Sequence, residues 1–303
     1  MNLNLPKKIT LIEVGPRDGF QFEKKIIPTK LKVEIISGLV EAGIKDIQVT
    51  SFVHPDVVPQ MADAEDLFKH LPKRNDARYH GLALNKKGVE RAHLSGLQHI
   101  EISISASDTH SLKNAGMSFE KAVETAKEMI RLAQEYKMEI RAGIQCAFGC
   151  AYEGRIGKER VLKIALDFLK MGIETLAISD TTGMANPLLI KNLINKLMPK
   201  VGNTPVVLHL HDTRGLGLVN MMAAMECGVT HFDTALAGMG GCPFVSDAAG
   251  NIATEDTAWL MKSLNIETGI DISKVAICSQ KLESFFKKKF PGKLYRLINK
   301  KPR

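Results

Sequence analysis

Cysteine is scarce in this chain and follows no pairing pattern. The five cysteines are odd in number and scattered, at Cys146, Cys150, Cys227, Cys242 and Cys278. A disulfide framework needs an even set at regular spacing and an oxidising environment. No second Cys or His pair at zinc spacing lies near Cys146 and Cys150. The sequence therefore predicts no disulfide-stapled fold and favours a reducing compartment, which we expect to be the cytoplasm.

Long apolar runs are also absent. No segment approaches the roughly 18 consecutive apolar residues that a membrane-spanning helix requires. The opening stretch MNLNLPKKITLIEVG contains no apolar core of the kind found in a secretory signal. We therefore expect no membrane partner.

Acidic residues are outnumbered by basic ones, and the formal net charge is +8. A basic balance suits an anionic partner, such as nucleic acid, anionic lipid or a phosphorylated small molecule. Much of the positive charge lies in the C-terminal stretch KKKFPGKLYRLINKKPR, and no recognisable nucleic-acid motif occurs in the chain. We expect a solvated basic tail and no nucleic-acid partner.

What the sequence does contain is a regular alternation of β-rich and helical segments. Residues 29–44, 118–137 and 157–172 repeat apolar side chains at the i, i+3, i+4 spacing of amphipathic helices. Eight strand–helix units in 303 residues favour an α/β fold of the (β/α)8 TIM-barrel type over an open doubly wound sheet. No G-x-G-x-x-G follows a strand, which argues against a dinucleotide fold. The predicted strands are 9–15, 46–53, 78–84, 99–106, 139–146, 175–180, 205–212 and 231–238.

One domain boundary is predicted near the C-terminus. No linker or low-complexity stretch divides residues 1–265, which we assign to the barrel. Residues 266–303 are predicted to form a short C-terminal helical extension with the basic tail, packed on the barrel.

Two histidines stand two residues apart in the apolar run VVLHLHD. On a strand, positions i and i+2 point to the same face, so His209 and His211 are expected to lie side by side. Two buried imidazoles on one wall need polar partners. A metal site is therefore favoured over a chance pairing in the core.

Other polar side chains stand where the predicted strands end, and TIM barrels carry their functional residues at these positions. A carboxylate, two imidazoles and an amide oxygen at one mouth suit Mg²⁺ or Mn²⁺, and less tightly Zn²⁺ or Co²⁺. The candidates are Arg17 and Asp18 after the first strand, Gln48 and Ser51 on the second, Asp180 on the sixth, and Cys242 and Asn251 in the loop after the eighth.

Each candidate also has a plainer interpretation. Taken alone, Arg17 and Asp18 are equally compatible with a salt bridge that closes the barrel mouth. Asp180 is placed to cap the following helix. An isolated cysteine is more often a small buried hydrophobic residue, but the glycines before Cys242 in GMGGCPF suit a loop that closes over a site.

Six motifs, in order along the chain, carry a family resemblance: GPRDGFQFEKK, VTSFVHPDVVPQMAD, CAFGCAYEGRI, SDTTGMANP, HLHDTRGLGLVN and GMGGCPFVSDAAGNIATED. Over residues 9–280 the chain resembles the 3-hydroxy-3-methylglutaryl-CoA (HMG-CoA) lyase family of metal-dependent TIM-barrel enzymes. Isopropylmalate and homocitrate synthases share the HxH pair and the barrel but not the GMGGCPF loop. The resemblance implies a metal-dependent carbon–carbon lyase that cleaves HMG-CoA to acetyl-CoA and acetoacetate.

The resemblance implies a metal site and a substrate class. Asp18, His209, His211 and Asn251 match the family's metal ligands. The implied cofactor is a divalent cation, Mg²⁺ or Mn²⁺, and the implied partner is an acyl-CoA substrate. We also expect a homodimer or a higher homo-oligomer.

The resemblance also implies roles for residues that bind no metal. Arg17 matches the arginine that polarises the thioester carbonyl and steadies the developing enolate. Cys242 matches a loop cysteine implicated in proton transfer, and Asp180 matches an aspartate proposed for acid–base work. Ser51 matches a residue near the carboxylate end of the substrate.

Two positions depart from the family pattern. The second strand carries Gln48 where the family has Glu, and Ala177 stands where the true lyases have serine. An amide offers N–H donors where a carboxylate offers only acceptors, so Gln48 is a candidate substrate-binding residue. Three alternatives therefore stay open: a lyase for a related 3-hydroxyacyl-CoA (citramalyl-CoA or a longer-branched glutaryl-CoA), a Claisen-type acyl-CoA synthase, and an inactive CoA-binding homologue.

Overall fold

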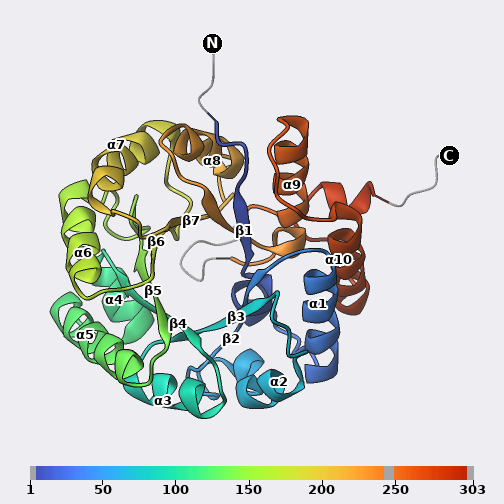
Figure 1. Ribbon diagram of the computed structural model, residues 1–303, viewed down its shortest axis with the longest axis horizontal. Coiled ribbons are helices and arrows are strands. Elements are labelled where there is room, and N and C mark those ends of the chain that lie inside the picture. The colour runs from blue at the N-terminus through green and yellow to red at the C-terminus, as the bar shows by residue number, and fades with distance from the viewer. Residues whose placement is uncertain (1–4, 242–248, 299–303) are drawn as a thin grey trace.

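The computed structural model describes residues 5–241 and 249–298, which form a closed barrel of eight parallel strands inside a ring of helices (Figure 1). Consecutive strands pair with each other, and β1 closes the barrel by pairing in parallel with β8. The strands are β1 (Thr10–Glu13), β2 (Asp46–Ser51), β3 (Arg78–Ala83), β4 (His99–Ser105), β5 (Glu139–Gln145), β6 (Thr175–Asp180), β7 (Val206–Leu210) and β8 (His231–Thr234).

Helices alternate with the strands, as expected of βαβ units. Two helices follow β4 and two follow β8. None of the helices in the described parts of the chain is long and apolar enough to cross a membrane. They are α1 (Thr29–Glu41), α2 (Ala64–His70), α3 (Lys86–Leu94), α4 (Asp108–Ala115), α5 (Phe119–Glu135), α6 (Lys158–Lys170), α7 (Pro187–Leu197), α8 (Gly217–Glu226), α9 (Thr254–Ser263) and α10 (Ile272–Phe286).

Helix α5 illustrates how the sequence specifies this ring. Ser118 begins the helix by accepting a hydrogen bond from the backbone N–H of Lys121. The apolar stripe then faces the barrel, because this orientation removes its apolar surface from water. The buried residues of the stripe are Ala122, Ala126, Met129, Ile130 and Ala133.

The TIM-barrel prediction and the order of the eight predicted strands are confirmed. The differences lie where strands end. The GPRDG motif folds into a π-helical turn, η1 (Gly15–Gly19), and residues predicted to extend β8 form a 3-10 turn, η4 (Leu236–Gly238). Strand β7 ends at Leu210, and His211 instead forms an isolated bridge with Asn251. At these points the chain leaves the sheet and builds the site.

Helix α10 packs against α1 and α9 at the side of the barrel (Figure 1). At the α1–α10 crossing, a Cβ at Gly38 would lie 2.6 Å from the Sγ of Cys278, so glycine permits the close approach. The division into a barrel and a C-terminal extension stays our proposal. Residues 299–303 of the basic tail lie outside the described residues.

The buried carboxyl group of Glu13 ties the end of β1 to the chain after β8. Glu13 Oε1 accepts hydrogen bonds from the backbone N–H groups of Gly15 at 2.7 Å and Leu236 at 2.9 Å, and Oε2 accepts one from the Thr254 hydroxyl at 2.7 Å. The Glu13 side chain is completely buried. Because Gly15 begins η1, these contacts hold that turn against the rest of the barrel.

We predict that Glu13→Ala lowers the free energy of unfolding by about 3 kcal/mol or more, because it leaves two backbone N–H groups and a hydroxyl without their acceptor. Glu13→Gln keeps one acceptor oxygen for both N–H groups, so it should cost less than half as much. Chemical unfolding monitored by circular dichroism measures both. Equal stability of the alanine variant and the parent would contradict this role.

Candidate active site

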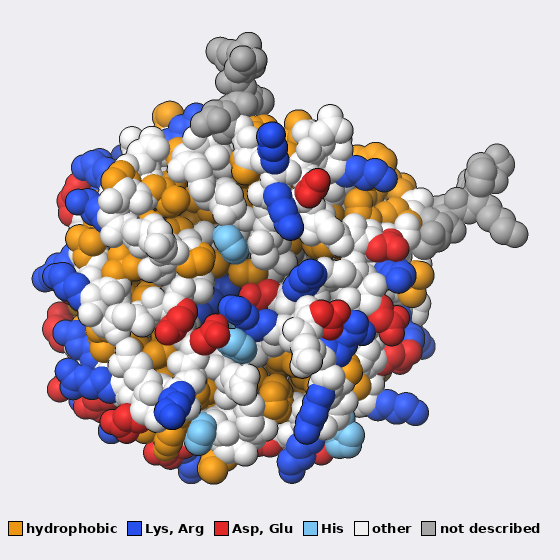
Figure 2. All heavy atoms as spheres, viewed as in Figure 1, with side chains coloured by type: hydrophobic (Ala, Val, Ile, Leu, Met, Phe, Trp, Pro, Cys, Tyr) orange, Lys and Arg blue, Asp and Glu red, His pale blue; other side chains and the backbone are white. Residues whose placement is uncertain are grey.

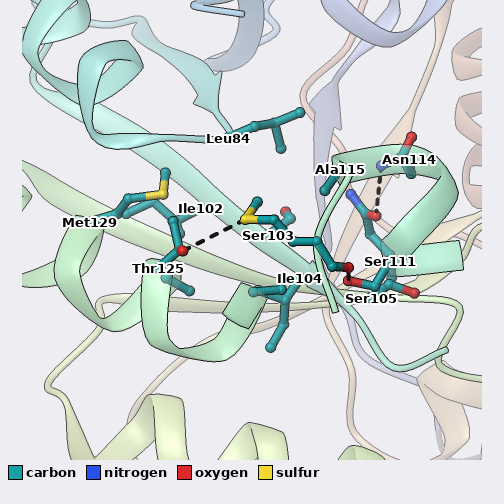
Figure 3. Close-up of a pocket in the computed structure, with 14 residues that line it drawn as sticks. Leu84, Ile102, Ser103, Ile104, Ser105, Ser111, Asn114, Ala115, Thr125 and Met129 are labelled. Carbon is teal, nitrogen blue, oxygen red and sulfur yellow. Dashed lines mark hydrogen bonds between the residues drawn. The ribbon is translucent and has the colours of Figure 1, made fainter. Parts of the chain in front are cut away.

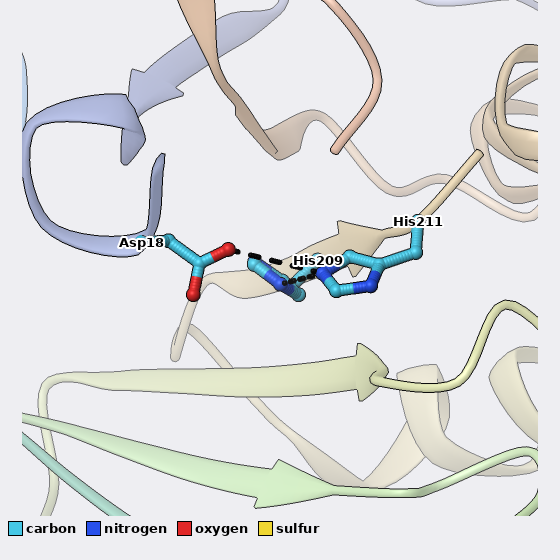
Figure 4. Close-up of side chains that lie close together, drawn as sticks. All are labelled: Asp18, His209 and His211. Carbon is cyan, nitrogen blue, oxygen red and sulfur yellow. Dashed lines mark hydrogen bonds and ion pairs between the residues drawn. The ribbon is translucent and has the colours of Figure 1, made fainter. Parts of the chain in front are cut away.

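Three side chains of types that can bind a metal ion meet at the carboxyl end of the barrel. Asp18 comes from η1, while His209 lies in β7 and His211 directly follows it (Figure 4). The two Nε2 atoms lie 3.0 Å apart, and His211 Nε2 lies 3.8 Å from Asp18 Oδ2. All three side chains are buried, with potential ligand atoms within 4.8 Å of one another. The two imidazoles therefore lie side by side, although the strand ends between them.

Neighbouring side chains orient these three residues. His209 Nδ1 lies 3.0 Å from Asp233 Oδ2, which leaves Nε2 to face the cluster. Asn251 donates from Nδ2 to Asp18 Oδ2 at 2.7 Å. The buried Oδ1 of Asn251 has no hydrogen-bond partner in the described part of the chain. An orphaned amide oxygen beside a carboxylate and two imidazoles completes a donor set that fits a divalent cation.

The protonation states of the cluster also suit a cation. Burial tends to raise the pKa of Asp18, but the Arg17 guanidinium and the two imidazoles outweigh it and hold that pKa well below its ordinary value. Burial lowers the pKa of His211. Near neutral pH the cluster therefore presents an ionised carboxylate and a neutral imidazole, which are the forms that bind metal.

Arg17 lies directly beside the cluster. Its Nη1 donates to Asp18 Oδ1 at 2.6 Å, and its Nε donates to Gln48 Oε1. These two contacts fix the plane of the guanidinium. No residue of the described segments accepts a hydrogen bond from Nη2. The salt bridge with Asp18 is therefore present, and one arm of the guanidinium fork is left for a further acceptor.

Gln48 lies behind Arg17. Its side chain is fully buried, and its Nε2 donates to Glu101 Oε2 at 2.7 Å. Gln48 is not among the residues that line the neighbouring cavity. The sequence predicts that Gln48 binds substrate, whereas its contacts in the structure are with two other residues of the site.

A cavity of about 450 Å³ opens at the carboxyl end of the barrel. Arg17, Asp18, His209 and His211 all line it, so the cluster and the arginine face one space. Ser51 lines it too, and its buried Oγ has no hydrogen-bond partner among the residues described. A concave space of this size with a few convergent polar groups is typical of a small-molecule site.

The other hollows among the described residues contain none of the candidate residues. One of them, of about 790 Å³, lies at the amino ends of the strands and is lined in part by Asp46, His80 and Glu139. On the face drawn in Figure 2, histidine and charged side chains of both signs gather near the centre. Another hollow, between α4, α5 and the barrel (Figure 3), measures about 20 Å³, which is room for about one water molecule. Because TIM-barrel chemistry takes place at the carboxyl ends of the strands, the cavity at Arg17 is the candidate active site.

Asp180 ends β6 beside the same cavity. Its Oδ1 accepts hydrogen bonds from the backbone N–H groups of Met184 at 2.8 Å and Ala185 at 3.1 Å, so it holds the following loop. Its buried Oδ2 has no partner within the described segments. Burial raises the pKa of Asp180 to about 6, against the opposing effect of those two N–H groups. Ser179 and Thr181 line the cavity, whereas Asp180 itself does not.

Cys242 lies in the segment 242–248, outside the described residues. Gly241, the residue before it, lines the cavity. The proposed part of Cys242 in proton transfer stays a prediction.

Three charged residues inside the barrel are not identified from the sequence, because none of them stands at the end of a predicted strand. They are Glu101 on β4, Arg141 on β5 and Asp233 on β8. All three are buried. Arg141 Nη1 donates to Asp233 Oδ1 at 2.9 Å, and Arg141 Nε lies 3.1 Å from Glu101 Oε2. The signal in the sequence is a charge within a strand that the sheet buries, such as Glu101 between Ile100 and Ile102.

Fold and site together define a class of protein. A TIM barrel with a buried His–His–Asp cluster and an adjoining arginine, both facing one cavity at the carboxyl ends of its strands, has the architecture of a barrel enzyme with a candidate metal site. Comparison with known proteins narrows this class.

The sequence matches the family described as HMGL-like over residues 8–281, and the chain belongs to that family. Mouse mitochondrial hydroxymethylglutaryl-CoA lyase is 38% identical over 271 residues, which cover 89% of this chain and 83% of the mouse protein. The hydroxymethylglutaryl-CoA lyase of Bacillus subtilis is 35% identical over 288 residues, covering 95% of this chain and 96% of that protein.

Solved structures agree with the sequence comparison. The hydroxymethylglutaryl-CoA lyase of Pseudomonas aeruginosa superposes with a TM-score of 0.94 at 34% identity, covering 97% of this chain and 98% of that one. An HMG-CoA lyase from Acinetobacter baumannii, solved with coenzyme A and 3-methylmalate, gives a TM-score of 0.93 at 34% identity and covers 98% of each chain. The fold and the family expected from the sequence are thereby confirmed.

We predict that the purified protein binds Mn²⁺ at one site and that His209→Ala weakens this binding at least about tenfold, because ligand loss removes a direct bond to the ion. Titration calorimetry of protein freed of metal measures the affinity. His70→Ala removes an imidazole that is largely exposed on α2 and serves as the control. Unchanged Mn²⁺ affinity in His209→Ala would place the ion elsewhere.

Proposed function

We propose that this protein cleaves 3-hydroxy-3-methylglutaryl-CoA to acetyl-CoA and acetoacetate. The observation that carries the proposal is the convergence of the Asp18–His209–His211 cluster and Arg17 on one cavity, in a chain whose relatives are HMG-CoA lyases. The reaction breaks the C2–C3 bond: the C3 hydroxyl loses its proton, C3 becomes a ketone, and the electron pair leaves on C2 as the enolate of acetyl-CoA. Protonation of that enolate completes the reaction.

Asp18, His209, His211 and Asn251 are the residues that would hold a divalent cation, for which we propose Mg²⁺ or Mn²⁺. When bound, such an ion acts as a Lewis acid that lowers the pKa of a coordinated hydroxyl and orients it. The contact between the Asp233 carboxylate and His209 Nδ1 supports this assignment, because it holds the proton on Nδ1 and leaves Nε2 free to bind the ion.

Arg17 and Ser51 would bind the acyl part of the substrate. Arg17 presents its unengaged Nη2 to the thioester oxygen, where negative charge grows as the C2–C3 bond breaks. The guanidinium is already held by Asp18 and Gln48, so little reorganisation is needed. The unpartnered Ser51 hydroxyl lines the same cavity and would donate to the carboxylate end of the substrate.

Asp180 would take part in proton transfer. A general base works best when its pKa lies near the operating pH, and the pKa of Asp180, at about 6, is close to neutrality. Its Oδ1 is committed to the loop, and its Oδ2 is not. Because Asp180 lies behind the cavity wall, we propose that the proton of the substrate's C3 hydroxyl reaches Asp180 through a water molecule or through the neighbouring Thr181 hydroxyl.

The alternatives that arise from Gln48 lose their main support. A shifted substrate would have to use the Gln48 amide, but this amide is fully buried and turned toward Arg17 and Glu101. The site therefore favours HMG-CoA over citramalyl-CoA or a longer-branched glutaryl-CoA. The cytoplasmic location and the homo-oligomer stay predictions; mouse relatives include lyases named mitochondrial and cytoplasmic.

The deciding experiment assays a panel of CoA thioesters with Mg²⁺, with Mn²⁺ and with a chelator. We expect HMG-CoA to be cleaved at an ordinary enzymatic rate, of order 1–10³ s⁻¹, and the chelator to abolish cleavage. Faster turnover of citramalyl-CoA or of a longer-branched substrate would replace the proposed substrate. Activity confined to condensation would indicate a synthase, and CoA binding without turnover would indicate an inactive homologue.

The raised pKa of Asp180 predicts the pH profile. A base must be ionised to act, so kcat/KM should fall about tenfold per pH unit as the pH drops below about 6, with Mn²⁺ kept saturating at each pH. Asp180→Asn should lose activity by at least about a hundredfold and show no such limb. Asp76→Asn, which alters an exposed aspartate paired with Arg74, is the control. An unchanged limb in Asp180→Asn would assign it to another group.

A further inference from the structure

Arg17 is aimed by a chain of two hydrogen bonds that crosses three elements of the barrel. The Arg17 Nε in η1 donates to Gln48 Oε1 on β2, and Gln48 Nε2 donates to Glu101 Oε2 on β4. All three side chains are buried, and Glu101 lines the candidate cavity together with Arg17. The strand between β2 and β4 contributes no side chain to this chain of contacts.

Glu101 determines which end of the Gln48 amide meets Arg17. A carboxylate only accepts hydrogen bonds and Arg Nε only donates, so the amide must turn its NH₂ group to Glu101 and its oxygen to Arg17. With a neutral donor in place of Glu101, the NH₂ group of Gln48 would lose its acceptor, and Arg17 alone would favour this orientation. The opposite orientation would set an NH₂ group against the Nε–H of Arg17. Polarisation of the amide by the charged Glu101 also strengthens the bond between Gln48 and Arg17.

Glu101 is itself held as an anion. Burial tends to raise its pKa, but Arg141 first and Arg17 next lower it below the ordinary value for glutamate. Ser103 donates to the other oxygen, Oε1, at 2.6 Å, and Arg141 Nε lies 3.1 Å from Oε2. The carboxylate is thus fixed in place and charged, as a positioning group needs to be.

We propose that Glu101 is a positioning residue for Arg17, acting through the amide of Gln48. The negative charge that faces Arg17 on this side is carried by the Glu101 carboxylate on β4, and the neutral Gln48 amide on β2 lies between the two. The proposal rests on the proposed role of Arg17 in HMG-CoA cleavage, and it deepens that role. It also accounts for an amide at the position where the family resemblance expects a glutamate, because two carboxylates in contact here would repel each other.

The test compares four proteins: the parent, Gln48→Glu, Glu101→Gln and the double variant that carries both changes. Gln48→Glu sets two carboxylates in hydrogen-bond contact, and Glu101→Gln removes the charge, so each should lower kcat at least about tenfold with little change in KM. The double variant exchanges the two side chains and restores one carboxylate and one amide. We expect it to recover at least about tenfold in kcat over Gln48→Glu.

The same Glu101→Gln change, made in a protein that already lacks Arg17, separates a positioning role from a merely structural one. In Arg17→Gln, adding Glu101→Gln should lower kcat/KM by no more than about twofold, because the group that Glu101 positions is gone. An equal loss from Glu101→Gln in both backgrounds would overturn the proposal, and so would a double variant whose losses simply multiply. Glu139→Gln, which removes a half-exposed carboxylate from the amino end of β5, is the matched control. If Glu101→Gln does not fold, the double variant against Gln48→Glu decides.

A measurement that does not depend on catalysis tests this proposal separately from the proposed function. In protein labelled with ¹⁵N-arginine, the Nε–H signal of Arg17, assigned by its loss in Arg17→Gln, should exchange slowly with water in the parent and the double variant. It should exchange at least about tenfold faster in Glu101→Gln. Absence of HMG-CoA cleavage by the parent would refute the function alone, whereas equal exchange rates in all four proteins would refute the positioning role alone.

Discussion

The site depends on one buried cation, Arg141, held between two carboxylates in the middle of the barrel. Burial opposes the charge of Arg141, but Asp233 and then Glu101 outweigh it and keep the pKa of the guanidinium above its ordinary value. Each carboxylate then reaches a different functional group. Asp233 contacts Nδ1 of His209, and Glu101 accepts a hydrogen bond from the amide that holds Arg17. One ion triad thus orients both halves of the site.

The contacts continue beyond this triad and close on themselves. Arg17 reaches Asp18, Asp18 lies near His211, and the two imidazoles face each other. Two buried polar atoms beside this ring, the Oδ1 of Asn251 and the Oγ of Ser51, have no hydrogen-bond partner among the described residues and are available to a ligand. The strand order of a closed barrel makes the ring possible, because it brings residues far apart in sequence to one mouth.

Much of this was open to prediction from the sequence. The alternation of strands and helices predicts the barrel because its period is regular. The spacing of His209 and His211 predicts that they lie side by side, because this depends only on local strand geometry. The role of Gln48 could not be predicted. Its partner Glu101 is 53 positions away along the chain, and only the barrel's strand order brings the two together. The π-helical turn that places Asp18 likewise depends on distant contacts, since Glu13 ties it to Leu236.

A crystal structure of the protein with Mn²⁺ and a CoA-bound acyl ligand, with the ion located by its anomalous signal, tests the central claim most directly. We predict one strong peak about 2.0–2.3 Å from ligand atoms of Asp18, His209 and His211. We also predict the Arg17 guanidinium within hydrogen-bond distance of the thioester oxygen, with Gln48 still seated between Arg17 and Glu101. An ion at the amino-end hollow near Asp46 and His80, or a thioester remote from Arg17, would contradict the account.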